Sequence, residues 1–286
     1  MTPRSPCTCF RLAEKAQDRT VTVKRATELA VSINQLLPGA AVSIRMTSTR
    51  PVVVARTSTF GPGGYGLTTR VGETSTARTC VFAEGTTVNR FETYLTIANP
   101  SAAPAHVRAH SFGSGGSQIG SMVTTVAPRR RVTVRLNNFL NNITSIASIV
   151  ASDVPIVVER PEYFGSPNSS GIPGSDVFGL RGTSTQWSFP GGETSGKSAF
   201  ILLFNPGGKS IPVRITAYQS NGRPQTYAVT LRPHARGTYE IGRIFKGLSS
   251  ARGETVRSTN GAGFVAEQTV FVPNHSTLRT TQGLVQ

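Results

Sequence analysis

The sequence predicts an all-β protein in which one strand-rich segment occurs more than once. Thr, Val, Ser and Gly are abundant, with 29 Gly and 18 Pro in 286 residues, and this composition favours short strands and many turns. Only 15% of the residues are charged, which argues against disorder caused by excess charge and against a helical bundle. Four landmark motifs also return in one order at spacings of 105 to 108 residues. Both observations point to repeated β units.

The landmarks define what is repeated. Cys80–Gly85 is matched by Trp187–Gly192, and Pro155–Arg160 is matched downstream by 264–268 and, 104 residues upstream, by Pro51–Arg56. We expect structural roles for the residues that mark these positions, which are Glu84, Asn99, Pro128, Glu159, Arg160, Trp187, Asn205, Pro233 and Glu267.

The spacing divides the chain into four parts. Residues 1–28 fit no copy and are expected to be a poorly ordered leader or to add one strand. Residues 29–78, the front segment, correspond to the second half of a copy and form an incomplete β-sandwich repeat. Residues 79–185, the middle segment, and residues 186–286, the rear segment, are fuller copies, each of about a hundred residues and large enough for a core of its own.

Each fuller copy has about seven short strands at intervals of 8–12 residues, separated by Gly and Pro turns, as in an Ig-like (Greek-key) β-sandwich. Val123–Val126 and Val132–Val134 are expected to form a hairpin-like pair about Pro128. The other expected strands are 94–98, 107–109, 143–150, 156–158, 201–204, 213–218, 227–231, 239–241, 255–257 and 264–266, with 20–24, 31–33, 41–44 and 51–54 nearer the N-terminus.

The recurring polar landmarks are interpreted as structural. Asn99 stands before Pro100 at the end of an apolar strand, where proline lacks the ladder donor and asparagine tolerates turn geometry. Glu159 and Glu267 recur within apolar strands. Paired carboxylates could serve acid–base chemistry, but a recurring Glu beside Arg or Gln is better explained by bonds to backbone or arginine at a sandwich end.

The charge balance favours anionic partners. Thirty Lys and Arg against fourteen Asp and Glu give a net charge of +16 and a pI near 11. Such a charge attracts anionic polymers, glycans or nucleic acid. The alternative is an arginine-rich, solvated surface without a partner. Nucleic acid lacks specific support, because no basic stripe with interleaved aromatic residues is visible. The candidate polyanion contacts are Arg129, Arg130, Arg131, Arg232 and Arg236.

No motif recommends a catalytic, cofactor or metal site, and we expect no enzyme. The three cysteines, Cys7, Cys9 and Cys80, make neither a disulfide framework nor a four-ligand zinc site, and Cys80 is expected to be a small apolar core residue. His106 and His110 would lie about 13 Å apart along a strand. His234 and His275 are isolated in the sequence.

Two glycine motifs resemble phosphate-binding loops. Gly191–Ser198 satisfies G-x-x-x-x-G-K-[ST], but a short apolar strand rather than a helix is expected after it, so a hairpin loop is the better interpretation. A nucleotide site there is a remote alternative. Gly61–Gly66 satisfies G-x-G-x-x-G, yet the strand-like 67–71 leaves no helix N-terminus for a pyrophosphate.

With these landmarks assembled, the chain resembles the tandem Ig-like repeats of large secreted or cell-surface bacterial proteins. Those repeats read W-x-F-A-E-G, Y-L-x-x-x-N-P, a Pro-Arg turn and P-x-V-x-E-R. The match covers about residues 30–272 and is carried by Trp187, 82–85, 94–95, 99–100, Pro155, Val157, Glu159, Arg160 and Tyr163. Departures are Cys80 in place of Trp and Phe-Pro-Gly-Gly in the rear copy. The resemblance implies an extracellular or cell-surface setting, although residues 1–25 lack the apolar run of a signal peptide and no apolar run reaches 18 residues.

The function expected is that of a non-enzymatic structural or adhesive module with a basic surface suited to anionic cell-surface polymers or glycans. The alternative is a ligand-binding module, for carbohydrate or nucleic acid, that uses loops at one sandwich end. The incomplete front segment adds an expectation. Its strands lack their front-half partners, so an edge is open to self-association unless residues 20–24 or another chain covers it.

Overall fold

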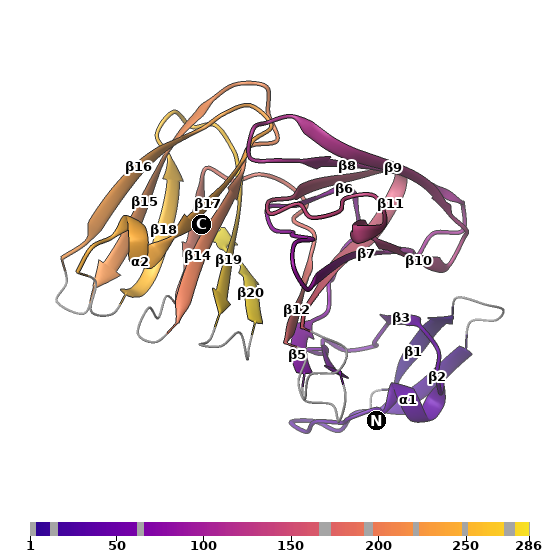
Figure 1. Cartoon of the computed structure of the whole chain (residues 1–286). Coiled ribbons are helices and arrows are strands. Elements are labelled where there is room, and N and C mark those ends of the chain that lie inside the picture. Colours follow the sequence, from indigo (N-terminus) through magenta and orange to yellow (C-terminus); the bar gives the residue numbers. More distant parts are fainter. Residues whose placement is uncertain are drawn as a thin grey trace.

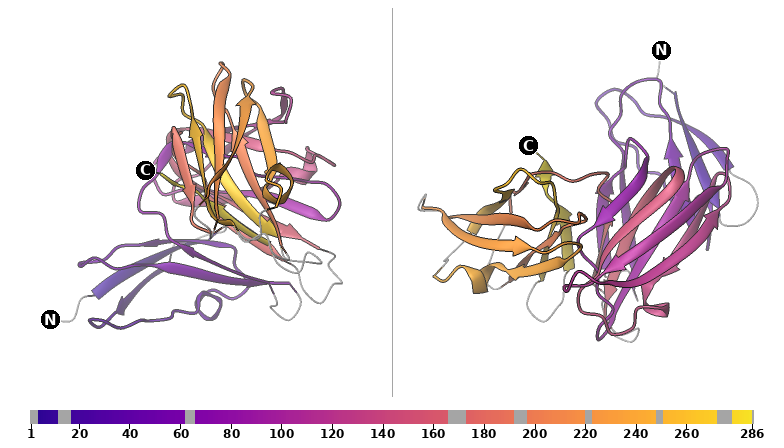
Figure 2. Two further views of the ribbon diagram at one scale, coloured as in Figure 1. Left: turned by 90° about the vertical axis from the view of Figure 1, so that its left-hand side faces the viewer. Right: turned by 90° about the horizontal axis from the view of Figure 1, so that it is seen from above.

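The computed structural model describes residues 4–11, 17–61, 66–165, 173–191, 197–219, 223–247, 251–271 and 278–285. Strands account for 57% of the chain and helices for 5%, which confirms the all-β class. Figure 1 shows the middle and rear segments as two strand-rich bodies, with the N-terminal strands and the front segment close to the middle one. Figure 2 shows the same three-part arrangement from the side and from above.

The N-terminal part forms two small sheets. β2 (Gln17–Thr22), β1 (Arg4–Arg11) and β3 (Val42–Met46) make an antiparallel sheet in that order, and β4 (Ala55–Phe60) pairs with β5 (Gly66–Val71). Residues 1–28 therefore contribute two strands, where a loose leader or one added strand was expected. The short helix α1 (Ile33–Leu36) replaces the strand expected at 31–33.

Both differences at 31–33 and 51–54 have physical reasons. The Ser32 hydroxyl accepts a hydrogen bond from the Gln35 amide and so caps α1, as serine does at helix starts. The apolar run 51–54 was expected to be a buried sandwich strand, but it lies outside the strands, and Val53 is 88% exposed. Around this run, the described part of the front segment contains few elements that could bury it.

The middle segment forms two sheets that share one long strand. β11 (Ala147–Phe164) pairs through its first half with β6 and β8 and through its second half with β7 and β12. β9 lies beyond β8, and β10 beyond β7. We expected two strands at 143–150 and 156–158; the chain instead continues through Pro155 as it changes sheets, at a point where the missing proline donor is tolerated. The other elements are β6 (Ala77–Phe82), β7 (Phe91–Asn99), β8 (Ala105–Phe112), β9 (Gln118–Val126), β10 (Arg130–Arg135), the 3₁₀ turn η2 (Leu136–Asn138) and β12 (Gly174–Phe178).

The rear segment has the same pairing order. Its sheets are β16-β15-β18-β13-β21 and β17-β14-β19-β20, which correspond to β9-β8-β11-β6 and β10-β7-β11-β12 of the middle segment. The two segments thus share a β-sandwich-like arrangement. The elements are β13 (Gln186–Phe189), β14 (Ser198–Phe204), β15 (Ile211–Gln219), β16 (Gln225–Leu231), β17 (Arg236–Glu240), α2 (Ile241–Ile244), β18 (Ala251–Ser258), β19 (Val265–Phe271), β20 (Leu278–Gln282) and β21 (Leu284–Val285).

The turn at Pro128 crosses between sheets and does not close the hairpin that was expected. β9, before the turn, pairs with β8, whereas β10, after it, pairs with β7 in the other sheet. Two strands joined by a turn have the same sequence pattern whether or not they pair with each other, so the sequence could not show that these two lie in different sheets. The turn at Pro233 is equivalent, and the residue after each proline, Arg129 or His234, has a positive φ of 56° or 53°.

Asn99 and Asn205 hold these crossovers in the same way. In each, the Nδ2 group donates to three carbonyls, one four residues later and two at the crossover turn. The acceptors are Ala103, Val126 and Ala127 for Asn99, and Lys209, Leu231 and Arg232 for Asn205, at 2.8–3.3 Å. The landmark asparagines therefore do more than end a strand, because each fixes the route by which the chain changes sheets.

Each segment has its own apolar core. In the middle segment Phe82, Leu95, Ile97 and Ile156 are fully buried within one cluster. In the rear segment Trp187 is buried at the position that Cys80 has in the middle segment. Its indole N–H donates to the Phe264 carbonyl at 2.9 Å.

Candidate functional site

The surface where the middle and rear segments meet is apolar at its centre. Val81, Ala83 and Ala147 of the middle segment pack against Leu202, Phe204 and Val265 of the rear segment in one buried cluster. The ring of Phe112 lies 5.7 Å from that of Phe204. The two bodies in Figure 1 are therefore in direct contact and are not merely tethered.

An extended stretch, Ala83–Glu84, lies between two charged side chains of the rear segment. The Ala83 amide donates to Oε1 of Glu267 at 2.7 Å, and the Ala83 carbonyl accepts from Nε of Arg236 at 2.7 Å. The Glu84 carboxylate pairs with Arg236 at 2.6 Å. The Phe-Ala-Glu-Gly motif of the sequence is thus a contact between segments.

Arg160 completes this junction from the middle segment. It is 1% exposed, and its NH1 group donates to the Glu84 carbonyl at 2.6 Å and to Oε2 of Glu267 at 3.0 Å. Its guanidinium carbon lies 5.8 Å from the centre of the Phe82 ring. Burial alone would lower the pKa of Arg160, but the carboxylates of Glu267, Glu162 and Glu84 outweigh burial and raise it. Arg160 therefore stays charged, as its partners require.

A similar contact joins the front and middle segments. Arg56 on β4 donates through NH1 to Oε2 of Glu159 at 3.0 Å, and its NH2 group contacts both Glu159 and Asp176. Burial raises the pKa of Glu159 to about 7, although the hydrogen bond and charge of Arg56 oppose the shift. Arg70 on β5 reaches the backbone carbonyls of Asp176 and Thr280.

The two contacts follow one rule. Arg56 and Arg160 occupy equivalent positions 104 residues apart, and Glu159 and Glu267 occupy equivalent positions 108 residues apart. In each case an arginine of one segment pairs with the glutamate of the next. We call this series the arginine–glutamate ladder. It accompanies three hairpins, β4–β5, β11–β12 and β19–β20, whose second strands lie side by side near the centre of Figure 1.

The ladder stops at both of its outer positions. Ala55 stands where the front segment would need the glutamate, and Gln268 stands where the rear segment would need the arginine. Gln268 instead donates to Oε2 of Glu254 within its own segment, at 2.9 Å. Burial raises the pKa of Glu254 to about 7 against this hydrogen bond.

The structure separates the five basic residues proposed as polyanion contacts. Arg129 and Arg232 are exposed, and Arg130 and Arg131 are half-buried. Arg236 is 4% exposed and bonded to Glu84, so its assignment as a polyanion contact was wrong: the contact between segments uses it. The sequence carried no signal for this burial, because the partner of Arg236, Glu84, lies 152 residues away in the chain.

Burial of carboxylates makes the surface more basic than the composition indicates. Within the described residues six acidic side chains are buried, against two basic ones, Arg160 and Arg236. Removing them from the whole-chain counts leaves eight acidic residues (14 minus 6) and 28 basic residues (30 minus 2), an excess of 20. The buried acidic residues are Glu84, Glu159, Glu162, Asp176, Glu254 and Glu267.

One end of the middle segment carries an open polar depression of about 580 Å³. It lies between the loop before β7 and the loop after η2. Arg135 pairs with Glu92 there at 2.7 Å, and Asn137 bonds the backbone of Phe91 and Thr93. The exposed amides of Asn89, Asn141 and Asn142 complete its rim. Its position is that expected for ligand binding by loops at a sandwich end.

The motif Gly191–Ser198 falls partly outside the described residues, which omit 192–196. Ser198 begins β14, a strand, so no helix N-terminus follows Lys197. The flanking strands β13 and β14 belong to different sheets, so the hairpin loop expected here was wrong: the chain crosses from one sheet to the other. The motif Gly61–Gly66 likewise falls largely on residues 62–65, outside the described part, and β5 follows it.

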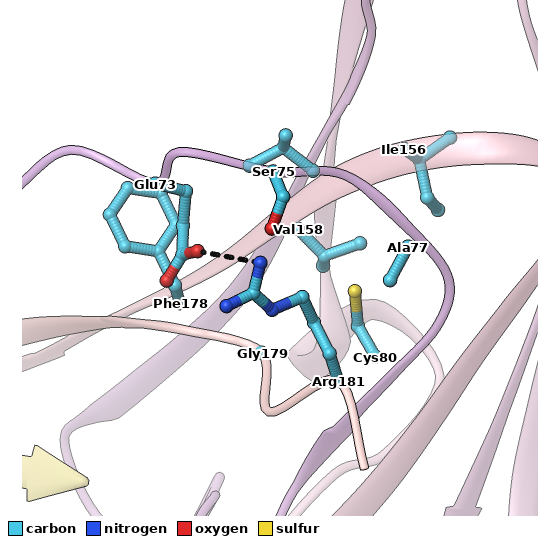
Figure 3. Close-up of a pocket in the computed structure, with 10 residues that line it drawn as sticks. Glu73, Ser75, Ala77, Cys80, Ile156, Val158, Phe178, Gly179 and Arg181 are labelled. Atoms are coloured by element: carbon cyan, nitrogen blue, oxygen red, sulfur yellow. Dashed lines mark ion pairs between the residues drawn. The ribbon is translucent and has the colours of Figure 1, made fainter.

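Cys80 lines a small space in the middle segment (Figure 3). The side chain is 3% exposed, and a Cβ built at Gly179 would come within 2.6 Å of the Cys80 Cβ. Figure 3 shows the Arg181–Glu73 ion pair, 3.6 Å long, at this space. Burial raises the pKa of the thiol to about 11. Cys80 is a core residue, as expected.

The histidines are dispersed. His106 bonds Asp153 at 2.6 Å on the surface, and His234 stacks on Phe112 with ring centres 5.5 Å apart. His275 lies outside the described residues. Within the described part of the chain, no three His, Cys, Asp or Glu side chains gather as metal ligands would. No helix in that part has the length and apolar character needed to cross a membrane.

Comparisons with known proteins add little. No protein-family model matches the sequence, and no curated protein matches it. Part of the chain (37%) is similar to 97% of the solved chain of Thermotoga maritima 1070, at 19% identity and a TM-score of 0.31. The Anabaena sensory rhodopsin transducer is similar over 31% of this chain and 91% of its own, at 33% identity and a TM-score of 0.27. At these TM-scores the likenesses establish no family, fold or activity.

Proposed function

We propose that the chain is a non-enzymatic structural or adhesive module of a secreted or cell-surface bacterial protein, built as tandem Ig-like β-sandwich repeats. The observation that carries the proposal is the arginine–glutamate ladder, because one kind of contact fixes each segment to the next. An array held in this way presents its surface at fixed spacing. The extracellular setting rests on the resemblance of the repeat motifs.

The surface charge supports anionic polymers as the partner. The ladder and its neighbours hold carboxylates inside the protein, and the outside keeps an excess of basic side chains. A dispersed positive surface binds polyanions by releasing their counterions, so affinity falls steeply with salt and follows the charge density of the polymer rather than its chemical type.

The test is binding of the purified chain to polyglutamate, hyaluronate and polyphosphate of matched length at several salt concentrations. We expect a linear fall of log K with log salt for all three, with affinity rising in the order of their charge density, from hyaluronate through polyglutamate to polyphosphate. Replacing Arg129 and Arg232 with Gln should reduce the slope by about 2, as should the matched control pair Lys24→Gln and Arg50→Gln, because each removed charge releases about one counterion fewer. Unchanged binding across salt would reject the proposal.

The polar depression beside Arg135 and Glu92 favours a second candidate, a carbohydrate-binding module. Its three exposed asparagine side chains offer the neutral donors and acceptors that sugar hydroxyls need. Saturable binding of one neutral glycan, insensitive to salt and lost in Asn141→Ala with Asn142→Ala, would favour this candidate. The remote nucleotide-binding alternative predicts ATP binding that Lys197→Ala abolishes, and it ends if ATP does not bind at millimolar concentration.

A further inference from the structure

The front segment has an open strand edge. Among the described strands, β3 pairs only with β1, and the order β2-β1-β3 matches β9-β8-β11 of the middle segment. There, the first half of β11 has β8 on one side and β6 on the other. The order of elements also agrees, because the short helix α1 comes directly before β3 and the 3₁₀ turn η2 comes directly before β11. The edge of β3 that faces away from β1 is thus where a counterpart of β6 would lie.

The same region exposes apolar surface. Seven of the twelve exposed large hydrophobic side chains among the described residues lie between Leu29 and Val71, a stretch of 43 residues. In the small cluster around α1 and β3, only Leu37 is buried. A core left half open in this way calls for another element to cover it. The seven are Leu29, Val31, Met46, Val52, Val53, Leu67 and Val71.

Charged groups that would receive the continuation of such a strand are already in place. In the rear segment Glu267 and Arg236 hold Ala83–Glu84, the residues that follow β6. The counterparts one segment earlier are Glu159 and Arg131, in the same register on their sheet: Arg131 is opposite Ala98 as Arg236 is opposite Phe204, and Glu159 is opposite Thr96 as Glu267 is opposite Leu202.

This earlier pair has no counterpart of Ala83–Glu84 among the described residues. Arg131 bonds the hydroxyls of Thr96 and Thr133, while its Nε is buried without a described acceptor. No carboxylate of the described residues forms an ion pair with it, although Arg236, its counterpart, has Glu84. Both oxygens of Glu159 accept from Arg56, whereas Glu267 gives one of its two to an amide.

We propose that the open edge of β3, with Arg131 and Glu159 beyond it, binds an extended strand of another polypeptide that has the chemistry of residues 77–85. The strand pairs with β3 through its backbone, and its alternate side chains extend the half-buried apolar face of Val42 and Ile44. The N–H of its alanine donates to one oxygen of Glu159, and its glutamate forms an ion pair with Arg131. Arg56 keeps the second oxygen of Glu159, as Arg160 does at Glu267.

The test uses a fluorescent synthetic peptide of residues 76–88 with Cys80→Val, titrated into the full chain at 0.15 M salt. The peptide has no net charge, because Arg78 balances Glu84, so the basic surface alone does not retain it. We expect saturable binding of one peptide per chain. Hydrogen exchange of the amides of residues 42–46 should slow in its presence, since the peptide covers that edge.

Two substitutions examine the same ion pair from its two sides. Arg131→Gln in the chain, or Glu84→Gln in the peptide, should weaken binding at least tenfold, because each leaves a charge without its partner. The matched control Arg129→Gln, an exposed residue two positions away, should leave binding unchanged. The peptide substitution needs no change to the chain, so it remains decisive if the Arg131 variant does not fold.

Equal binding of a scrambled peptide would overturn the proposal, as would equal effects of Arg131→Gln and Arg129→Gln, or unaltered exchange at residues 42–46. The inference rests on the array proposed above, and the assays separate the two. Absence of peptide binding in a preparation that still binds polyanions with the expected salt dependence removes the strand site alone. Conversely, a preparation that binds the peptide but shows no salt-dependent polyanion binding removes the polymer function alone.

Discussion

Replacing Arg160 with Met tests whether the ladder holds the middle and rear segments together. Among the described residues, the substitution leaves the Glu267 carboxylate, 1% exposed, with the Ala83 amide as its one remaining hydrogen-bond partner, and it removes a donor from the Glu84 carbonyl. Breaking a buried ion pair by removing one partner costs about 3–5 kcal/mol. We therefore expect the free energy of unfolding of the rear segment to fall by about that amount.

Arg56→Met is the matched control, because it breaks the equivalent contact where solvent reaches it. The Arg56 side chain is 41% exposed, against 1% for Arg160, so water can partly replace it beside Glu159 and Asp176, and we expect a smaller loss than for Arg160→Met. The double variant Arg160→Met with Glu267→Leu removes both charges. It leaves the buried Ala83 amide without an acceptor, at a cost of about 1–3 kcal/mol, and shares with Arg160→Met the loss of a donor to the Glu84 carbonyl. Because it leaves no buried charge without a partner at this pair, it should be more stable than Arg160→Met alone.

The assay is urea unfolding followed by the fluorescence of Trp187, the one tryptophan of the chain, which is buried in the rear core. The reasoning is refuted if Arg160→Met costs no more than Arg56→Met. It is equally refuted if the double variant loses the sum of the two single losses, since the pair would then carry no coupling.

Three further predictions concern single sites. Because burial raises the pKa of Glu254 to about 7, the folded chain binds this proton more tightly than the unfolded chain; the resulting stabilisation is complete below about pH 4.5 and is lost as pH rises through 7. Glu254→Gln should flatten that dependence and be more stable than the parent at pH 8 by roughly 2–3 kcal/mol, measured by urea unfolding across pH; equal slopes would contradict it. Asn99→Ala and Asn205→Ala should each cost about 2–4 kcal/mol in thermal or urea unfolding, because three carbonyls lose a donor, and a cost below about 1 kcal/mol at either site would exclude the bracing role. In a variant with both other cysteines replaced by Ser, Cys80 should react with a thiol reagent at pH 7 only as fast as the chain unfolds, and rapid labelling of the native protein would disprove its burial.

Local patterns predicted the strands well where burial alternates along the chain. In β7, alternate residues from Thr93 to Asn99 are buried, and Leu95 and Ile97 of the expected strand 94–98 lie on the buried face. The run 51–54 was misread for a non-local reason. Continuous apolar residues indicate a strand covered on both faces, but they cannot show whether the covering strands exist.

The junction could be predicted only in part. Recurrence identified Glu159, Arg160 and Glu267, and the expectation that such a glutamate bonds backbone or arginine is confirmed at Glu267. Sequence could not show that the partners come from different segments, because the pairs are 103 and 107 residues apart. Arg236 was assigned to the surface for the same reason. It follows a turn, where arginine is usually exposed, and it is buried only because the middle segment packs against it.

Hydrogen exchange of the Ala83 amide tests the central claim most directly. This amide belongs to the middle segment, and its acceptor is the Glu267 carboxylate of the rear segment. If the ladder joins the segments into one array, exchange requires the junction to open, and the amide should be among the slowest in the chain. Exchange at the rate of exposed loop amides such as that of Gly115 would contradict the account.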